Sequence, residues 1–241
     1  MCVQSASAIA DWPVVKALLE SGANPRALAG SGWDTLQYAA LLGRPGNIEG
    51  WCNYFQAQKD KGGASWDINR REHIAGMCAL SYATVVGANV TAVVQALVAG
   101  GANTHYYMHT GTNILHNISL NIDATESDIE YILSLPGVKD LVDVPMRART
   151  LKWKLRFAAA RLLVRLGSKK EKFKAVASWK GQTPLCCASR NGNIGGIKLL
   201  IVNGGANRRL KNVNGDTALD QARQFAGENL HAASATLLSG P

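Results

Sequence analysis

The most reactive side chains of this sequence are its cysteine thiols, and their spacing limits the chemistry they can support. The five cysteines are Cys2, Cys52, Cys78, Cys186 and Cys187, in a chain of 241 residues. An odd number in so long a chain is not the disulfide framework of a small secreted protein. No two cysteines have the Cys-x-x-Cys spacing of a zinc site, and adjacent thiols are poorly placed to share a tetrahedral metal. We therefore expect free thiols, no metal site, and an intracellular, reducing compartment, namely the cytoplasm.

Catalysis would need a nucleophile beside a base, or a loop that holds phosphate, and no such pattern occurs. The sequence has no His-Glu-x-x-His, no phosphate loop ending in Gly-Lys-Ser/Thr, and no Gly-x-Ser-x-Gly. Cys187 with a distant histidine is an imaginable nucleophile pair, but its place in a repeated motif favours packing. Residues 192–196 are rich in glycine, and they echo residues 46–50, so we interpret both as turns between helices. The sequence predicts no enzymatic activity and no cofactor.

Positive charge is concentrated in one segment of the chain. The formal net charge is +9. Residues 147–174 contain eleven cations and one anion, Glu171, which sum to +10, so the remaining residues sum to −1. The cations are Arg147, Arg149, Lys152, Lys154, Arg156, Arg161, Arg165, Lys169, Lys170, Lys172 and Lys174. The basic character therefore belongs to one insertion and not to the fold as a whole.

An internal repeat predicts the elements that position these residues. A glycine followed four residues later by a leucine, and usually by an alanine three residues after that, occurs five times. These marker glycines are Gly32, Gly76, Gly111, Gly181 and Gly215. Gly-Ala-Asn begins ten residues before three of them, at residues 22–24, 101–103 and 205–207. Two motifs that keep one offset in three places indicate repeated structural units.

The repeated units resemble ankyrin repeats, which carry G-x-T-P-L-H-x-A at a period of about 33 residues. Residues 181–188, Gly-Gln-Thr-Pro-Leu-Cys-Cys-Ala, match this motif best. The motif histidine is present only as His116, which predicts weaker links between neighbouring turns and a modest stability. The resemblance implies an all-α fold: an ankyrin-repeat solenoid of about six helix-turn-helix units with a basic helical insertion.

The register of the repeats predicts a single ankyrin-repeat domain over residues 1–241. Residues 1–28 would be a truncated first repeat that lacks its leading turn. Repeats 2–4 would occupy residues 29–143, with a finger insertion near residues 58–75. The basic helical insertion would occupy residues 144–178, and repeats 5–6 would occupy residues 179–241.

The spacing also predicts how each helix begins and ends. The residue two positions after each marker glycine should cap the first helix of its repeat, and four of these five residues have an oxygen that can accept from the first turn. They are Asp34, Cys78, Asn113, Thr183 and Thr217. Gly22, Gly101 and Gly205 should end the second helices in the left-handed conformation.

The basic insertion reads as a helix over residues 147–166, stopped by Gly167 and followed by a basic tail. Three interpretations remain open. The helix packs its apolar stripes on the repeats and leaves a solvated basic face. Alternatively, it lies on anionic lipid, with Trp153 and Phe157 inserted. The third interpretation is contact with a nucleic-acid backbone or an acidic protein surface.

The ankyrin resemblance implies a non-catalytic scaffold or adaptor that binds a protein partner through its finger loops and concave face. Membrane or nucleic-acid association through the basic insertion is the alternative, and an interaction module of a larger enzyme or effector is a third. Seven finger residues have the side-chain types that dominate binding energies at interfaces. They are Trp33, Trp66, Arg70, Arg71, Tyr106, Tyr107 and Trp179.

Overall fold

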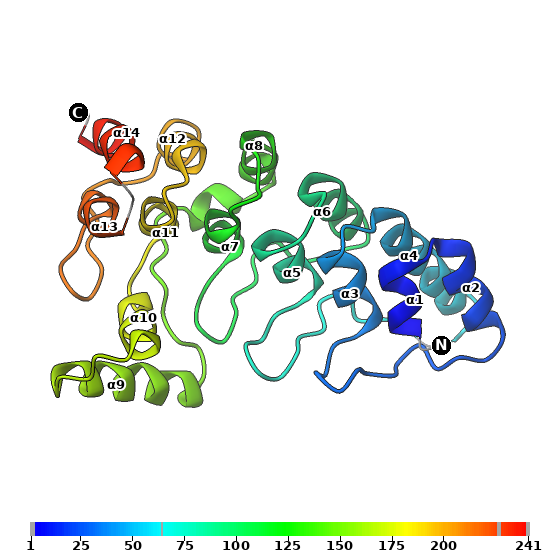
Figure 1. Cartoon of the computed structure of the whole chain (residues 1–241). Helices are drawn as coiled ribbons and strands as arrows, with labels where there is room; N and C mark the ends of the chain where they lie inside the picture. Colours follow the sequence, from blue (N-terminus) through cyan, green and yellow to red (C-terminus); the bar gives the residue numbers. More distant parts are fainter. Residues whose placement is uncertain (1–2, 64, 226–227, 240–241) are drawn as a thin grey trace. The chain divides into compact units, whose positions relative to one another are not determined.

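Every regular element in the described part of the chain is a helix (Figure 1). The structure is a computed structural model that describes residues 3–63, 65–225 and 228–239, without the side chains of residues 171, 172, 175, 225 and 228–232. No helix in these ranges is both long enough and apolar enough to cross a membrane. The chain forms two compact units, Met1–Thr104 and His105–Pro241, called here the N-terminal and C-terminal units.

The N-terminal unit contains three pairs of helices. The pairs are α1 (Val3–Ile9) with α2 (Trp12–Glu20), α3 (Thr35–Leu41) with α4 (Pro45–Asp60), and α5 (Ala79–Val85) with α6 (Val90–Ala99). The first helices of the pairs pack in one row, α1 on α3 and α3 on α5. The second helices form another row, α2 on α4 and α4 on α6. Leu36, Trp51, Leu80 and Leu97 fill the space between the rows and are at most 2% exposed.

The C-terminal unit repeats this arrangement and adds a hairpin. The helices α7 (Ile114–Leu120), α11 (Pro184–Arg190) and α13 (Ala218–Phe225) pack in one row. The helices α8 (Glu126–Ser134), α12 (Ile194–Val202) and α14 (Glu228–Ser239) form the second row, and a 3₁₀ turn, η1 (Val138–Leu141), follows α8. Between η1 and α11 the chain forms α9 (Leu151–Arg165) and α10 (Glu171–Trp179), which pack on each other (Figure 1).

The predicted caps are confirmed at the helices that begin after the marker glycines. Asp34 accepts the backbone N–H of Gln37 at 2.9 Å, and Asn113 accepts that of His116 at 3.0 Å. Cys78, Thr183 and Thr217 take the equivalent places. Gly22, Gly101 and Gly205 have φ values of 86°, 92° and 71°, as predicted for residues that end a helix in the left-handed region.

The marker glycines themselves have a backbone role that the spacing alone did not reveal. All five have a positive φ, between 74° and 92°. Residues with a side chain rarely adopt this conformation. At Gly111 a Cβ atom would also lie 2.1 Å from the carbonyl oxygen of Arg147, so only glycine fits there.

Glutamine replaces the motif histidine effectively in the N-terminal unit. The Gln37 side-chain amide donates to the carbonyl of Met77 at 3.2 Å, which joins α3 to the loop before α5. Gln4 donates in the same way to the carbonyl of Ala27. Links between neighbouring turns are therefore present at both positions, in spite of the missing histidine.

The basic insertion is more ordered than the sequence suggested. The helix α9 begins at Leu151, four residues later than predicted, because Thr150 caps it by accepting the N–H of Trp153. The prediction of a basic tail over residues 169–174 was wrong, because α10 begins at Glu171 and includes most of these residues. Phe173 and Ala177 share one face of α10, and that spacing lets α10 pack on α9.

Candidate functional site

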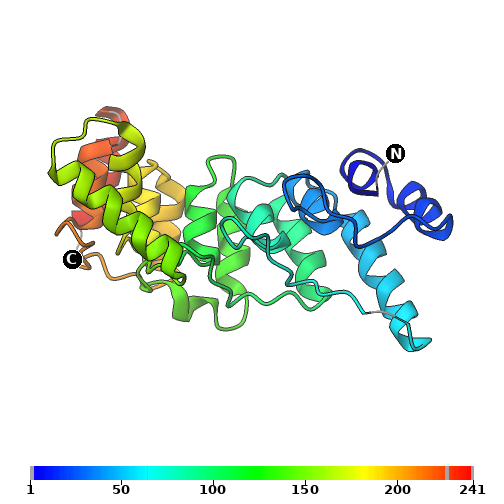
Figure 2. The ribbon, with the colours of Figure 1, turned by 90° about the horizontal axis from the view of Figure 1, so that it is seen from below.

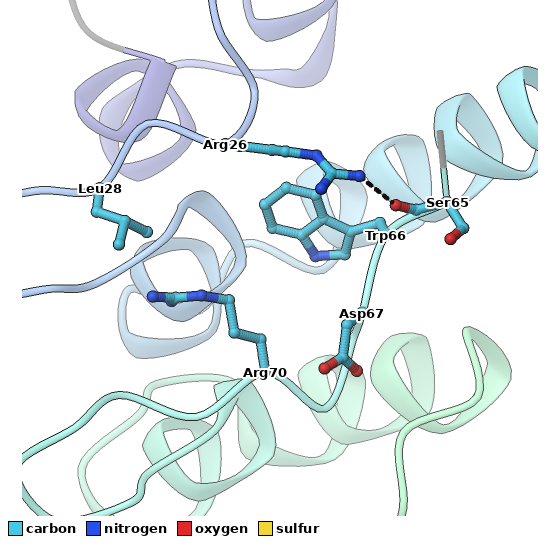
Figure 3. A pocket seen from close by; sticks show the side chains of 6 residues that line it. All are labelled: Arg26, Leu28, Ser65, Trp66, Asp67 and Arg70. Carbon is cyan, nitrogen blue, oxygen red and sulfur yellow. Dashed lines mark hydrogen bonds between the residues drawn. The ribbon is translucent and has the colours of Figure 1, made fainter. Parts of the chain in front are cut away.

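Two of the predicted finger residues of the N-terminal unit, Trp66 and Arg70, line one hollow. It has a volume of about 330 Å³ and lies between the loop after α2 and the loop after α4. The lining residues are Arg26, Leu28, Ser65, Trp66, Asp67 and Arg70 (Figure 3). We call this the Arg26–Arg70 hollow.

Arg26 links the two loops that form this hollow. Its Nη2 donates to the carbonyl oxygen of Ser65 at 2.9 Å (Figure 3), and its backbone N–H donates to Oδ1 of Asn24 at 2.9 Å. A guanidinium group has five N–H donors, so the bond to Ser65 leaves others for a ligand. Arg26 is thus fixed across the hollow, and some of its guanidinium N–H groups remain available to a ligand.

The ring of Trp66 packs against two other aromatic side chains, those of Trp51 and Phe55. Its ring centroid lies 5.1 Å from that of Trp51, edge to face, and 5.2 Å from that of Phe55. Its indole Nε1 is buried and has no hydrogen-bond partner among the described residues. Packing of this kind fixes the orientation of the indole beside the two arginines.

Arg70 belongs both to the hollow and to the frame of the unit. Its guanidinium donates to the carboxylate of Asp34 at 3.2 Å and to the carbonyl of Gly32 at 3.3 Å. Burial raises the pKa of the Asp34 carboxyl, although hydrogen bonds from Gln37 and Arg70 act in the opposite direction. Removing Arg70 would leave a buried carboxylate without its countercharge.

The other two predicted residues of this unit lie outside the lining of the hollow. Trp33 packs its ring 4.6 Å from that of Tyr82 and 5.3 Å from that of Tyr38, so it braces its loop. Arg71 is exposed.

In the C-terminal unit the structure corrects one prediction. Tyr106 is only 2% exposed, and its hydroxyl accepts a hydrogen bond from the Asn117 amide at 2.7 Å, so it packs inside the unit and is not available to a partner. Tyr107 is half-buried beneath Arg149, whose guanidinium carbon lies 4.0 Å from the ring centroid. Trp179 is half-buried at the end of α10.

The cations of the basic insertion reach solvent, apart from one that is half-buried and one whose side chain lies outside the described residues. The exposed cations are Arg147, Arg149, Lys152, Lys154, Arg156, Arg165, Lys169, Lys170 and Lys174. Arg161 is half-buried, and Lys172 is the one not described. Three of them line a second hollow of about 240 Å³, called here the α9 hollow. Its lining residues are Lys154, Ala158, Arg161, Leu162, Arg165 and Lys180.

Sequence reasoning missed Arg26 and Leu28, although a signal for Arg26 was present. Arg26 lies two residues after the first Gly-Ala-Asn, where the other two copies of the motif have His105 and Arg209. These positions belong to the loops that precede the marker glycines. A search of those loops for charged residues would have found Arg26, whereas nothing in the pattern distinguishes Leu28.

Three of the four described cysteine thiols, those of Cys78, Cys186 and Cys187, are buried among packed helices, and that of Cys52 is half-buried. The four described cysteines are free, and burial raises the pKa of the Cys187 thiol well above its ordinary value. The Cys187 Sγ donates to Oε1 of Gln182 at 3.4 Å. In the ranges that the structure describes, no three His, Cys, Asp or Glu side chains gather as a metal site.

Comparisons with known proteins identify the repeat and the fold. Residues 180–213 match the family described as Ankyrin repeat. A chain in the structure of the Bd0816 predatory endopeptidase from Bdellovibrio bacteriovorus, in complex with immunity protein Bd3460, is similar with a TM-score of 0.61 and 21% identity, covering 98% of this chain and 97% of that one. The human ASB11 ankyrin repeat domain gives a TM-score of 0.49 and 21% identity, covering 99% and 98%. No curated protein sequence matches the chain.

Proposed function

Because this chain is an ankyrin-repeat protein, we propose that it is a non-catalytic adaptor that binds a protein partner through the Arg26–Arg70 hollow. The fold supports binding in general, since repeat proteins present loops and grooves of variable sequence on a constant frame. One of the similar chains also comes from a structure in which two proteins form a complex. Neither point identifies a partner for this protein.

The observation that carries the proposal is the set of side chains that meet in this hollow. Two guanidinium groups, an indole, Leu28 and one carboxylate, that of Asp67, meet between the loops of adjacent repeats, so cations outnumber anions in the lining. Arginine and tryptophan are the side chains most enriched among residues that dominate binding energy. Leu28 is 48% exposed and adds an apolar contact at the rim. The lining fits a partner segment with a carboxylate beside an apolar side chain.

The proposal includes a reducing intracellular compartment, the cytoplasm. The free thiols Cys52, Cys78, Cys186 and Cys187 support it, because paired disulfides are usual in secreted proteins.

Affinity capture from a native lysate of the source cells tests the proposed function. The full chain is compared with Arg26→Glu, and with Arg209→Glu as the matched control, because Arg209 occupies the same repeat position in the C-terminal unit. Reversing the charge of Arg26 should repel a carboxylate in the hollow. We expect proteins retained by the full chain and by Arg209→Glu to be lost with Arg26→Glu, at unchanged thermal stability.

Two results would contradict the proposal. If Arg26→Glu retained the same proteins in the same amounts, the Arg26–Arg70 hollow would not be the binding site. If the full chain retained no protein beyond those held by an unrelated ankyrin-repeat control, the adaptor function itself would be wrong.

A further inference from the structure

The outward face of α9 is apolar and exposed. Leu151, Leu155, Leu162 and Leu166 are 71%, 61%, 57% and 75% exposed. Their spacing places all four on one side of the helix. Phe157 and Ala160, at 2% and 3% exposed, lie on the opposite side, where α9 packs on α10. The four leucines, called here the leucine stripe, thus have no covering element in the described part of the chain, and α9 faces the viewer along its length in Figure 2.

Cations border the leucine stripe on both sides. At 100° per residue, Lys152 and Arg156 lie along one side, and Lys154, Arg161 and Arg165 along the other. The sequence of α9 contains no acidic residue. In the described ranges no ion pair involves any of these five cations. An apolar stripe with long cationic side chains along both edges is the pattern of a helix that lies in a membrane interface.

The α9 hollow strengthens the case for a phosphate-bearing surface. Lys154, Arg161, Arg165 and Lys180 surround it, and no carboxylate lines it. Ala158 and Leu162 form its apolar wall and connect it with the leucine stripe. A lipid headgroup carries its phosphate directly beside its acyl chains, so one molecule would meet both the cations and the leucines.

We propose that α9 docks on an anionic phospholipid surface, with the leucine stripe at the boundary of headgroups and acyl chains and a headgroup phosphate in the α9 hollow. The phosphates of a nucleic acid would pair with the cations, but the leucines would stay exposed to water. A bilayer provides phosphates for the cations and an apolar region for the leucines, and a helix can lie on it without a groove of matching shape. This docking is independent of the Arg26–Arg70 hollow, because that hollow belongs to the N-terminal unit.

Co-sedimentation of the full chain with lipid vesicles tests the proposal. Vesicles of phosphatidylcholine alone are compared with vesicles that also contain phosphatidylserine, at low and at high salt. We expect binding to the phosphatidylserine vesicles, weakened by salt because the cations are exposed and screened. Vesicles of phosphatidylcholine alone should bind much less of the protein.

Two pairs of substitutions separate the leucine stripe from the cations. Leu155→Gln with Leu162→Gln should weaken binding to phosphatidylserine vesicles by at least about tenfold, because two apolar side chains no longer enter the interface. Arg161→Gln with Arg165→Gln should weaken binding and reduce its salt dependence, while the remaining cations, such as Lys152 and Arg156, keep part of it. Ile122→Gln, at a residue that is 83% exposed in the same unit, and Arg209→Gln with Lys211→Gln are the matched controls and should bind like the unchanged chain.

The outcomes that overturn the proposal are specific. Equal binding to both kinds of vesicle, or no binding to either, would exclude an anionic lipid surface. Full binding by the double leucine variant would exclude insertion of the stripe. The basic insertion would be a nucleic-acid site if the chain bound single-stranded RNA and did not bind vesicles. In that case the double leucine variant should bind the RNA as well as the unchanged chain does. Circular dichroism verifies that each variant remains helical, as expected for substitutions at exposed positions.

Discussion

His116 joins its repeat to the next one through Gln182, which lies 66 residues later in the sequence. Its Nε2 lies 3.0 Å from the carbonyl oxygen of Gln182, which can only accept, so Nε2 donates in this bond. Its Nδ1 lies 3.3 Å from the backbone nitrogen of Asn113 and 2.8 Å from Oδ1 of the same residue. Burial lowers the pKa of His116 to about 4, although the hydrogen bond to Gln182 acts in the opposite direction. The folded protein therefore keeps this ring neutral at a pH where an unfolded chain would protonate it.

We predict that His116 makes the protein less stable as the pH falls from about 6.5 toward 4. In this range the unfolded state takes up a proton that the folded state does not, so the free energy of unfolding declines, by an amount on the order of 3 kcal/mol. His116→Gln should keep most of its stability near neutral pH, because a glutamine amide in the equivalent slot, Gln37, donates to the loop of the next repeat in the same way. It should also lose most of this pH dependence. Urea unfolding near pH 7 and near pH 5 checks this, and an unchanged pH dependence in the variant would refute it.

Single residues were predictable where the repeat motif fixes them. The caps Asp34 and Thr183 follow from their distance to a marker glycine, because a helix of fixed length must begin there. Tyr106 was not predictable, since its burial depends on Asn117, which lies on another element. Arg26 was missed although it occupies a repeated position, two residues after Gly-Ala-Asn, because that position lies in a loop outside the helix motif.

At the scale of elements, the loop between α4 and α5 closes around one buried carboxylate. Glu72 is 3% exposed and accepts the N–H groups of Ile74, Ala75 and Met77 at 2.5, 2.7 and 3.0 Å. Burial alone would raise the pKa of Glu72, but the bonds from Met77, Ile74 and Ala75 outweigh it, so the pKa lies below its ordinary value.

We expect Glu72→Gln to lower the free energy of unfolding by about 1–3 kcal/mol near neutral pH. The carboxylate accepts three backbone N–H groups with two charged oxygens, whereas an amide has one neutral oxygen that can accept. Since the folded pKa is depressed, the contribution of Glu72 is complete above about 4.5, the ordinary pKa of glutamate, and is lost as the pH falls through the folded value. The difference in the free energy of unfolding between the variant and the unchanged chain should therefore become smaller at acidic pH. Denaturation of both proteins across this pH range measures it, and a constant difference would contradict the assignment.

The hairpin of α9 and α10 should be the least protected pair of helices in the C-terminal unit. Only Phe157 and Ala160 of α9 are buried, whereas nearly every residue of α11 is. Fewer buried contacts mean a smaller free energy of local opening. Hydrogen exchange should be faster for the amides of residues 155–165 than for those of residues 186–190. Equal protection would mean that α9 is covered in solution.

Among the elements, α9 was predicted to within a few residues because its apolar spacing is helical. The helix α10 was not predicted, because the run of lysines at its start resembles a charged tail and only the later apolar residues reveal its packing face. Which apolar face of α9 is exposed was also left open by the sequence. The helix has apolar residues on two sides, and only the position of α10 decides which of them is covered.

At the scale of the whole molecule, the charge and the candidate site belong to different units. The +10 segment, residues 147–174, lies in the C-terminal unit, and the Arg26–Arg70 hollow lies in the N-terminal unit. The repeat pattern predicted the helical fold, because the same motif recurs along the chain. The hollow itself forms where the loops of two repeats meet, so no single repeat sequence describes it. Substitutions in one unit can therefore test one proposed surface while the other stays unchanged.

Site-specific photo-crosslinking tests the central claim, that the Arg26–Arg70 hollow binds a protein partner. A photoreactive phenylalanine analogue replaces Leu28 at the rim of the hollow or, as a control, Ile9, which is 67% exposed at the end of α1. We predict that illumination in native lysate links the residue-28 variant to one partner that Arg26→Glu fails to capture, and that the residue-9 variant does not form this product. Equal products from both positions, or none at position 28 while the partner is still captured, would contradict the account.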